Sequence, residues 1–123
     1  MAKINSRQKG CRGERMFAQL LREHGYEAER GQQHAGGKDS PDVKTNMLGV
    51  HWEIKFVEKL NLHNAMEQSK RDAGEGEMPL VGHKRSREEW LVTQPFEDWI
   101  KLYKAYAFMN FTRARYEEGE DNE

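Results

Sequence analysis

The stretch Val50-His51-Trp52-Glu53-Ile54-Lys55-Phe56-Val57 decides the fold, because it joins a strand-forming composition to two charged side chains. It is rich in β-branched and aromatic residues and follows a short turn, which predicts a β-strand. Successive side chains of a strand point to opposite faces. Glu53 and Lys55 are therefore expected on one face, while the aromatic and aliphatic side chains that alternate with them face a core.

Eleven residues before Glu53, Pro41-Asp42 opens a second β-prone run at 43–45. Glu and Lys are rarely buried without a partner, and a divalent metal with a phosphate would supply partners for both. Asp followed by Glu-x-Lys is a small arrangement that can hold a metal at a sheet edge and attack a phosphodiester there. Asp39 is a competing acid, but Asp42 is preferred because it follows Pro41 and precedes the strand.

The pattern Pro41-Asp42…Glu53-Ile54-Lys55 resembles the PD-(D/E)xK nuclease superfamily. The resemblance extends over residues 7–93, because Glu14 lies in a preceding helical pattern and Gln68 in the helix that follows. This order is similar to that of small Holliday junction resolvases of archaeal and phage type. It implies an α/β, restriction-endonuclease-like core, in which helices flank a central mixed β-sheet of about four to five strands.

The resemblance also implies a set of site residues and a metal. The catalytic residues would be Glu14, Asp42, Glu53, Lys55 and Gln68. The ligands of Mg²⁺, for which Mn²⁺ would substitute, would be Asp42, Glu53, the backbone carbonyl of Ile54 and, through water, Glu14. Lys55 would orient the attacking water or neutralise developing charge, and Gln68 would hold the water or a phosphate oxygen. Taken alone, Glu14 also fits a first-turn residue stabilised by the helix dipole.

Basic and polar side chains on both sides of this motif are expected to contact DNA. They are Lys9, Arg12, Arg15, Arg30, Gln33, Lys38, Ser40, Lys84, Arg85 and Arg87. Those of the turn at 84–87 suit phosphate contact, although a solvated hairpin tip is the ordinary alternative. A zinc or histidine-metal nuclease is not expected, because the five histidines lack the i, i+4 spacing with a Glu and Cys11 is the only cysteine. His51 shares a face with Glu53 and is expected to be partly exposed.

Length and charge set the organisation of the chain. Its 123 residues suit one domain, expected over 1–116, followed by an acidic and disordered tail at 117–123. The net charge is −1, but removing the five acids of the tail leaves sixteen acidic and twenty basic residues, a net of +4. No run approaches the roughly 18 apolar residues of a membrane helix, so we expect an intracellular protein of a microbe or a phage-infected host.

The remaining periodicities predict the other elements. Helices are expected from Ser6 to about His24, from Asn61 to Ala73 and from Phe96 to Phe111. Further strands are expected at 26–30, 78–83 and 90–93. The last helix is more aromatic than one core face requires, which predicts core packing together with a dimer interface.

These observations favour a Mg²⁺-dependent, structure-specific DNA endonuclease, with a Holliday junction resolvase first. A homodimer would present two sites to a four-way junction of approximate two-fold symmetry. Alternatives with the same core are a nicking, flap-cutting or repair enzyme, or a phage nuclease of broad specificity. A non-catalytic DNA-binding module is the alternative from another class.

Overall fold

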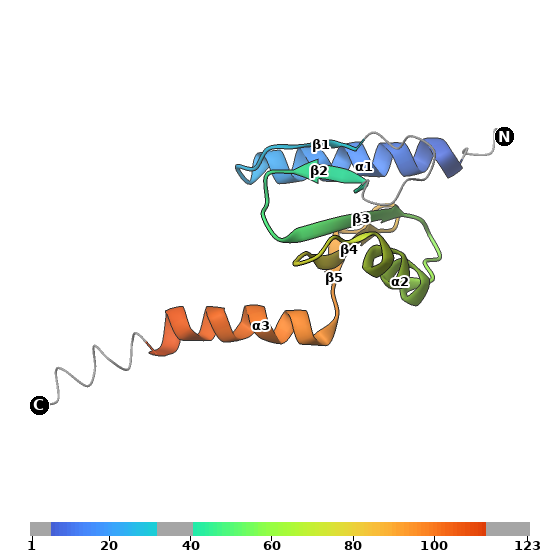
Figure 1. Cartoon of the computed structure of the whole chain (residues 1–123). Helices are drawn as coiled ribbons and strands as arrows, with labels where there is room; N and C mark the ends of the chain where they lie inside the picture. Colours follow the sequence, from blue (N-terminus) through green and yellow to red (C-terminus); the bar gives the residue numbers. More distant parts are fainter. Residues whose placement is uncertain (1–5, 32–40, 113–123) are drawn as a thin grey trace, which may run out of the picture.

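A computed structural model describes residues 6–31 and 41–112, which form a mixed α/β structure (Figure 1). The elements are α1 (Ser6–Glu23), β1 (Ala28–Arg30), β2 (Val43–Thr45), β3 (Val50–Phe56), α2 (Leu62–Asp72), β4 (Met78–Lys84), β5 (Leu91–Thr93), α3 (Phe96–Ala107) and the π-helical turn η1 (Phe108–Thr112). The predicted α/β class is confirmed. Gln33, Lys38, Asp39, Ser40 and the acidic tail at 117–123 lie outside the described residues, so the expectations for them stay predictions.

The strands form a mixed arrangement around β3. β3 pairs in parallel with β4, so that Glu53 lies opposite Val81, and β4 pairs antiparallel with β5. β1 and β2 form an antiparallel pair of their own. The backbone N–H of Asp42 donates to the carbonyl of Trp52 at 3.2 Å, which holds the start of β2 beside β3. The predicted sheet therefore consists of a two-stranded and a three-stranded group that meet at Asp42.

Helix α1 covers the face of β3 that carries the aromatic side chains. The ring of Phe17 lies 4.7 Å from that of Trp52 and 5.1 Å from that of Trp90, between centroids. Gly13 lets the helix approach closely, because a Cβ at that position would lie 2.6 Å from Cβ of Phe56. The helix predicted from Ser6 to about His24 is thus confirmed, and its apolar side chains pack on β3.

Helix α2 covers the opposite face, which carries His51 and Glu53. Asn61 caps the helix by accepting a hydrogen bond from the N–H of Asn64, and Ser69 Oγ donates to the carbonyl of Leu80 at 3.0 Å. The prediction that His51 is partly exposed is wrong, because its exposed fraction is 2%. The physical reason is that helices cover both faces of a strand that pairs in parallel.

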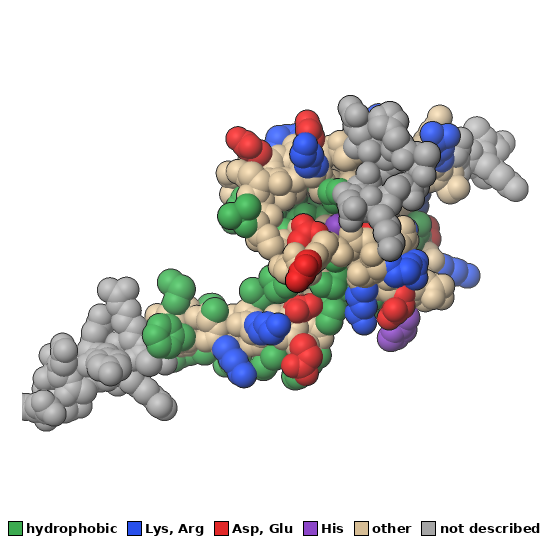
Figure 2. All heavy atoms as spheres, in the orientation of Figure 1, with side chains coloured by type: hydrophobic (Ala, Val, Ile, Leu, Met, Phe, Trp, Pro, Cys, Tyr) green, Lys and Arg blue, Asp and Glu red, His purple; other side chains and the backbone are tan. Residues whose placement is uncertain are grey.

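Helix α3 differs from its prediction. It contains no buried residue, and it projects from the rest of the structure as the orange segment of Figure 1. Hydrophobic side chains lie along its length in Figure 2. The expected core packing is wrong, since α1 and α2 already cover the two faces of β3; the dimer interface stays a prediction. None of the described helices is both long and apolar enough to cross a membrane.

Candidate active site

Backbone hydrogen bonds fix the position of Asp42 against β3. Its Oδ2 accepts the N–H of Ile54 at 2.8 Å, and its carbonyl accepts the N–H of Gly31 at 2.9 Å. A side chain on Gly31 would overlap the carbonyl oxygen of Pro41, so glycine allows this approach. The N–H and C=O of one strand residue point to the same side, and the carbonyl of Ile54 therefore also faces the side of Asp42.

Glu53 is the most buried of the three acids expected at the site, with an exposed fraction of 2%. Burial, followed by the negative charge of Asp42 and a hydrogen bond with its side chain, raises the pKa of Glu53 to about 8. Lys55 opposes this shift, with its Nζ 3.7 Å from Glu53 Oε1. Two buried carboxylates in contact with each other need either a shared proton or a cation between them.

Lys55 is held between β3 and α2. Its Nζ donates to Oε1 of Gln68 at 3.3 Å while lying near Glu53. Gln68 is half-buried on α2, off the centre of the packed face. The structure therefore brings together four of the residues expected at the site, Asp42, Glu53, Lys55 and Gln68, from the start of β2, from β3 and from α2.

Glu14 lies at the margin of this cluster. It is buried on α1 and accepts a hydrogen bond from Arg30 Nε at 2.6 Å. Burial raises its pKa, and the hydrogen bond from Arg30 lowers it in part. The charge of Asp42 acts in the same direction as burial. Arg30 is thus paired with an acid of the site, and its expected contact with DNA stays a prediction.

Several basic side chains expected to contact DNA meet at the end of β3. Lys9 Nζ lies 4.7 Å from the ring centroid of Phe56, Lys84 Nζ lies 5.6 Å and Arg12 Cζ lies 5.9 Å from it. Lys9 also forms an ion pair with Glu58 at 2.9 Å. The first turns of α1 and the end of β4 therefore place three cations around one aromatic ring.

The other described arginines that are expected to contact DNA have exposed side chains. Arg85 forms two hydrogen bonds with the carboxylate of Glu88, at 2.8 and 3.0 Å. Arg87 is exposed and has a φ of 65°, and Arg15 is exposed on α1. Exposed arginines are free to reach a phosphate without losing a buried contact.

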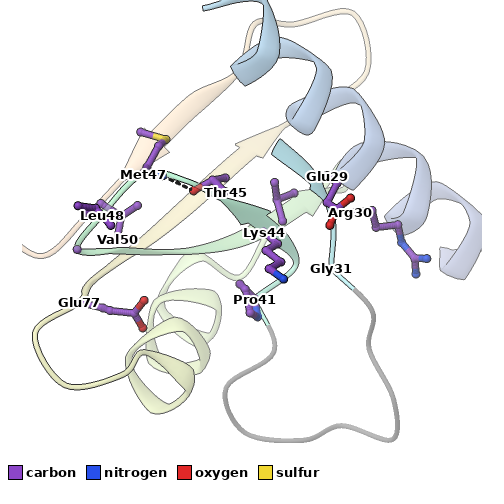
Figure 3. A pocket seen from close by; sticks show the side chains of 12 residues that line it. Glu29, Arg30, Gly31, Pro41, Lys44, Thr45, Met47, Leu48, Val50 and Glu77 are labelled. Atoms are coloured by element: carbon purple, nitrogen blue, oxygen red, sulfur yellow. Dashed lines mark hydrogen bonds between the residues drawn. The ribbon is translucent and has the colours of Figure 1, made fainter. Parts of the chain in front are cut away.

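A hollow of about 720 Å³ lies beside the cluster (Figure 3). Its lining includes Arg30, Gly31, Pro41 and Lys44, which Figure 3 places around the two ends of the chain that flank residues 32–40. Asp42, Glu53 and Lys55 do not line it. The carboxylates therefore lie next to this hollow, against the strand, and not on its wall.

Sequence reasoning missed two members of the neighbourhood of Glu53. His51 is buried, and its Nε2 has no hydrogen-bond partner among the described residues. Asp72, in the last turn of α2, offers a carboxylate oxygen within 4.8 Å of ligand atoms of both His51 and Glu53. A signal for Asp72 existed, because Asp72 follows Gln68 by four residues and so shares its helix face.

The donor set beside β3 fits a hard divalent cation. Mg²⁺ takes oxygen ligands, usually one or two carboxylates with several waters. Asp42 and Glu53 supply two carboxylates in contact, and their mutual repulsion is among the causes that raise the pKa of Glu53. A cation between them would relieve that repulsion, so the residues present suit the metal that the resemblance implies.

The raised pKa of Glu53 predicts a pH dependence of stability in metal-free protein. Between about pH 4.5 and pH 8 the folded protein binds more protons at Glu53 than the unfolded chain does. The free energy of unfolding should therefore fall as pH rises through this window. Urea unfolding in a chelator at pH 5 and pH 8 would measure the fall.

The matched variants for this prediction are Glu53→Gln and Glu75→Gln, of which the second changes an exposed residue. Glu53→Gln should reduce the pH dependence, leaving the contribution of Glu14, whose pKa is also raised. Glu75→Gln should leave it unchanged. If the free energy of unfolding of Glu53→Gln fell between pH 5 and pH 8 as much as that of the unaltered chain, Glu53 would not be the source of the pH dependence.

Comparison with known proteins gives a likeness to a solved structure. No protein-family model matches the chain, and no curated protein matches it. Among solved structures, the chain is similar to Hjc, a Holliday junction resolvase of the archaeal hyperthermophile Archaeoglobus fulgidus. The two share 24% sequence identity over 70% of this chain and 72% of that chain, with a TM-score of 0.49.

Proposed function

We propose that the chain is a Mg²⁺-dependent DNA endonuclease that hydrolyses phosphodiester bonds. The observation that carries the proposal is the contact between the buried carboxyl groups of Asp42 and Glu53, with the ammonium of Lys55 3.7 Å from Glu53. The hydrogen bond from Ile54 to Asp42 accounts for only one of these polar groups, and an apolar set would fill the space of the others at lower cost.

The residues of the cluster would have different roles in the reaction. Asp42, Glu53 and the carbonyl of Ile54 would hold the metal, with Glu14 reaching it through water. Bound Mg²⁺ would neutralise charge on the phosphate and lower the pKa of a bound water. Lys55, positioned by Gln68, would orient that water or neutralise charge as it develops on the phosphate.

The proposed substrate is branched DNA, with the four-way junction first. This choice rests on the order of motifs that resembles small resolvases, and on the cations of Lys9, Arg12 and Lys84 around Phe56, which suit phosphate contact. A homodimer would present two equivalent sites to the two-fold symmetry of a junction. A nicking, flap-cutting or broad-specificity nuclease would use the same residues.

The test is cleavage of a panel of labelled DNAs by the purified chain in Mg²⁺ and in Mn²⁺. The panel holds a four-way junction, a nicked duplex, a flap, a linear duplex and a single strand, and Lys55→Ala serves as the inactive control. Lys70→Ala, on the exposed side of α2, is the matched lysine control and should cut like the unaltered chain.

Paired, symmetric cuts in the junction that disappear in Lys55→Ala are the expected result. Equal cutting of all five DNAs would retain the active site and overturn the preference for junctions. Junction binding without cutting in either metal would overturn catalysis and favour the DNA-binding module.

A further inference from the structure

Glu53 has a second set of neighbours on the side of α2, and they differ chemically from Asp42. One atom each from His51, Glu53 and Asp72 can be chosen so that all three lie within 4.8 Å of one another. His51 and Glu53 project from the same face of β3, two residues apart, and Asp72 comes from the C-terminal turn of α2. The packing of α2 on β3 thus brings the carboxylate of Asp72 to the imidazole of His51 and the carboxylate of Glu53, about twenty residues earlier in the sequence.

His51 is the unusual member of this group. Its exposed fraction is 2%, and its Nε2 has no hydrogen-bond partner in residues 6–31 and 41–112. A buried polar atom left without a partner destabilises the fold, because it loses its hydrogen bonds to water. A bound cation would satisfy the imidazole nitrogen and both acids together.

We propose that His51, Glu53 and Asp72 form a site for a transition-metal ion such as Zn²⁺, adjacent to the Mg²⁺ site of the proposed nuclease and sharing Glu53 with it. One imidazole with two carboxylates is a donor set that favours Zn²⁺ and related ions over Mg²⁺, which takes oxygen alone. Ligand atoms at about 2.1 Å from one ion lie at most about 4.2 Å apart. Small rotations of the three side chains would close the group around it.

Three protein ligands leave at least one coordination position for water or a substrate oxygen. Glu53 belongs to both sets, with Asp42 on one side and His51 with Asp72 on the other. Its two carboxylate oxygens would let it contribute to each. The transition-metal site depends on His51 and Asp72, which have no part in the proposed hydrolysis, so it stands whether or not the chain cuts DNA.

The test is calorimetric titration of the purified full-length chain with Zn²⁺ in the presence of excess Mg²⁺, which occupies oxygen-only sites. The unaltered chain should bind one equivalent of Zn²⁺ at β3, and His51→Gln should weaken this binding by at least about 10- to 100-fold. His63→Gln is the matched control, since His63 is exposed on α2. It should bind as the unaltered chain does.

Two further variants test the same site independently of His51 and distinguish it from the proposed active site. Asp72→Asn should also weaken Zn²⁺ binding, and it serves where loss of the buried His51 unfolds the chain. Asp42→Asn should retain Zn²⁺ binding while losing cleavage, which separates this site from the proposed active site. Unchanged Zn²⁺ binding in folded His51→Gln or Asp72→Asn, or no Zn²⁺ binding by the unaltered chain, would overturn the proposal.

Discussion

If the chain is the proposed nuclease, Asp42→Asn is expected to slow cleavage of the preferred DNA by about 10³-fold, because loss of a carboxylate proposed to bind the metal removes several kcal/mol of transition-state stabilisation. The substitution keeps the size of the side chain and an oxygen that can accept the N–H of Ile54, a bond of 2.8 Å in the structure. The carboxylate charge is thus removed while the link to β3 is preserved. Single-turnover cleavage at saturating enzyme would measure the loss across a series of Mg²⁺ concentrations.

The control is Asp98→Asn, which changes an acid in the first turn of α3, away from the cluster. It should cleave at the rate of the unaltered chain. Thermal unfolding of both variants would show that the fold is retained. Cleavage by folded Asp42→Asn within a few-fold of the unaltered rate would remove Asp42 from the proposed mechanism.

Gly13→Ala and Gly10→Ala are expected to change stability in opposite directions, although both place alanine inside α1. Alanine favours a helix interior over glycine by roughly 0.5–1 kcal/mol. At Gly10 nothing lies within 4 Å of the new Cβ, so that gain should appear as greater stability. At Gly13 the new Cβ would lie 2.6 Å from Cβ of Phe56, and such overpacking costs about 1–3 kcal/mol.

The helical preference is common to both variants, so the difference between their free energies of unfolding isolates the contact of α1 with β3. We expect Gly13→Ala to be the less stable of the two by about 1–3 kcal/mol. Urea unfolding at one pH, with equal slopes for the two variants, would measure it. Equal stabilisation by both substitutions would mean that α1 does not approach Phe56 this closely.

Most of the elements could be predicted, because their signals are local. The alternation of charged and aromatic residues in β3, the apolar stripe of α1 and the cap at Asn61 each depend on neighbours in sequence. The meeting of Asp42, Glu53, Lys55 and Gln68 was implied by the resemblance to the nuclease superfamily. The structure places Asp42 against Glu53, Glu53 near Lys55 and Lys55 against Gln68. Their roles in catalysis stay predictions.

The errors concern contacts that local patterns do not encode. The burial of His51 depends on α2 packing over the face that carries it. Asp72 joins Glu53 only through that same packing, so a search of the motif alone passes over it. The aromatic content of α3 indicated a buried helix, but apolar periodicity shows that a face is available and not what covers it.

The position of β3 between two helices limits the ways in which the site can be regulated. Because α1 and α2 pack on opposite faces of the strand, its backbone amides should exchange with solvent only when the whole fold opens. Glu53 and the amide that binds Asp42 both belong to this strand. Local fluctuations of β3 are therefore not expected to displace Glu53, and we expect control of the proposed site to act through access of DNA and the supply of metal.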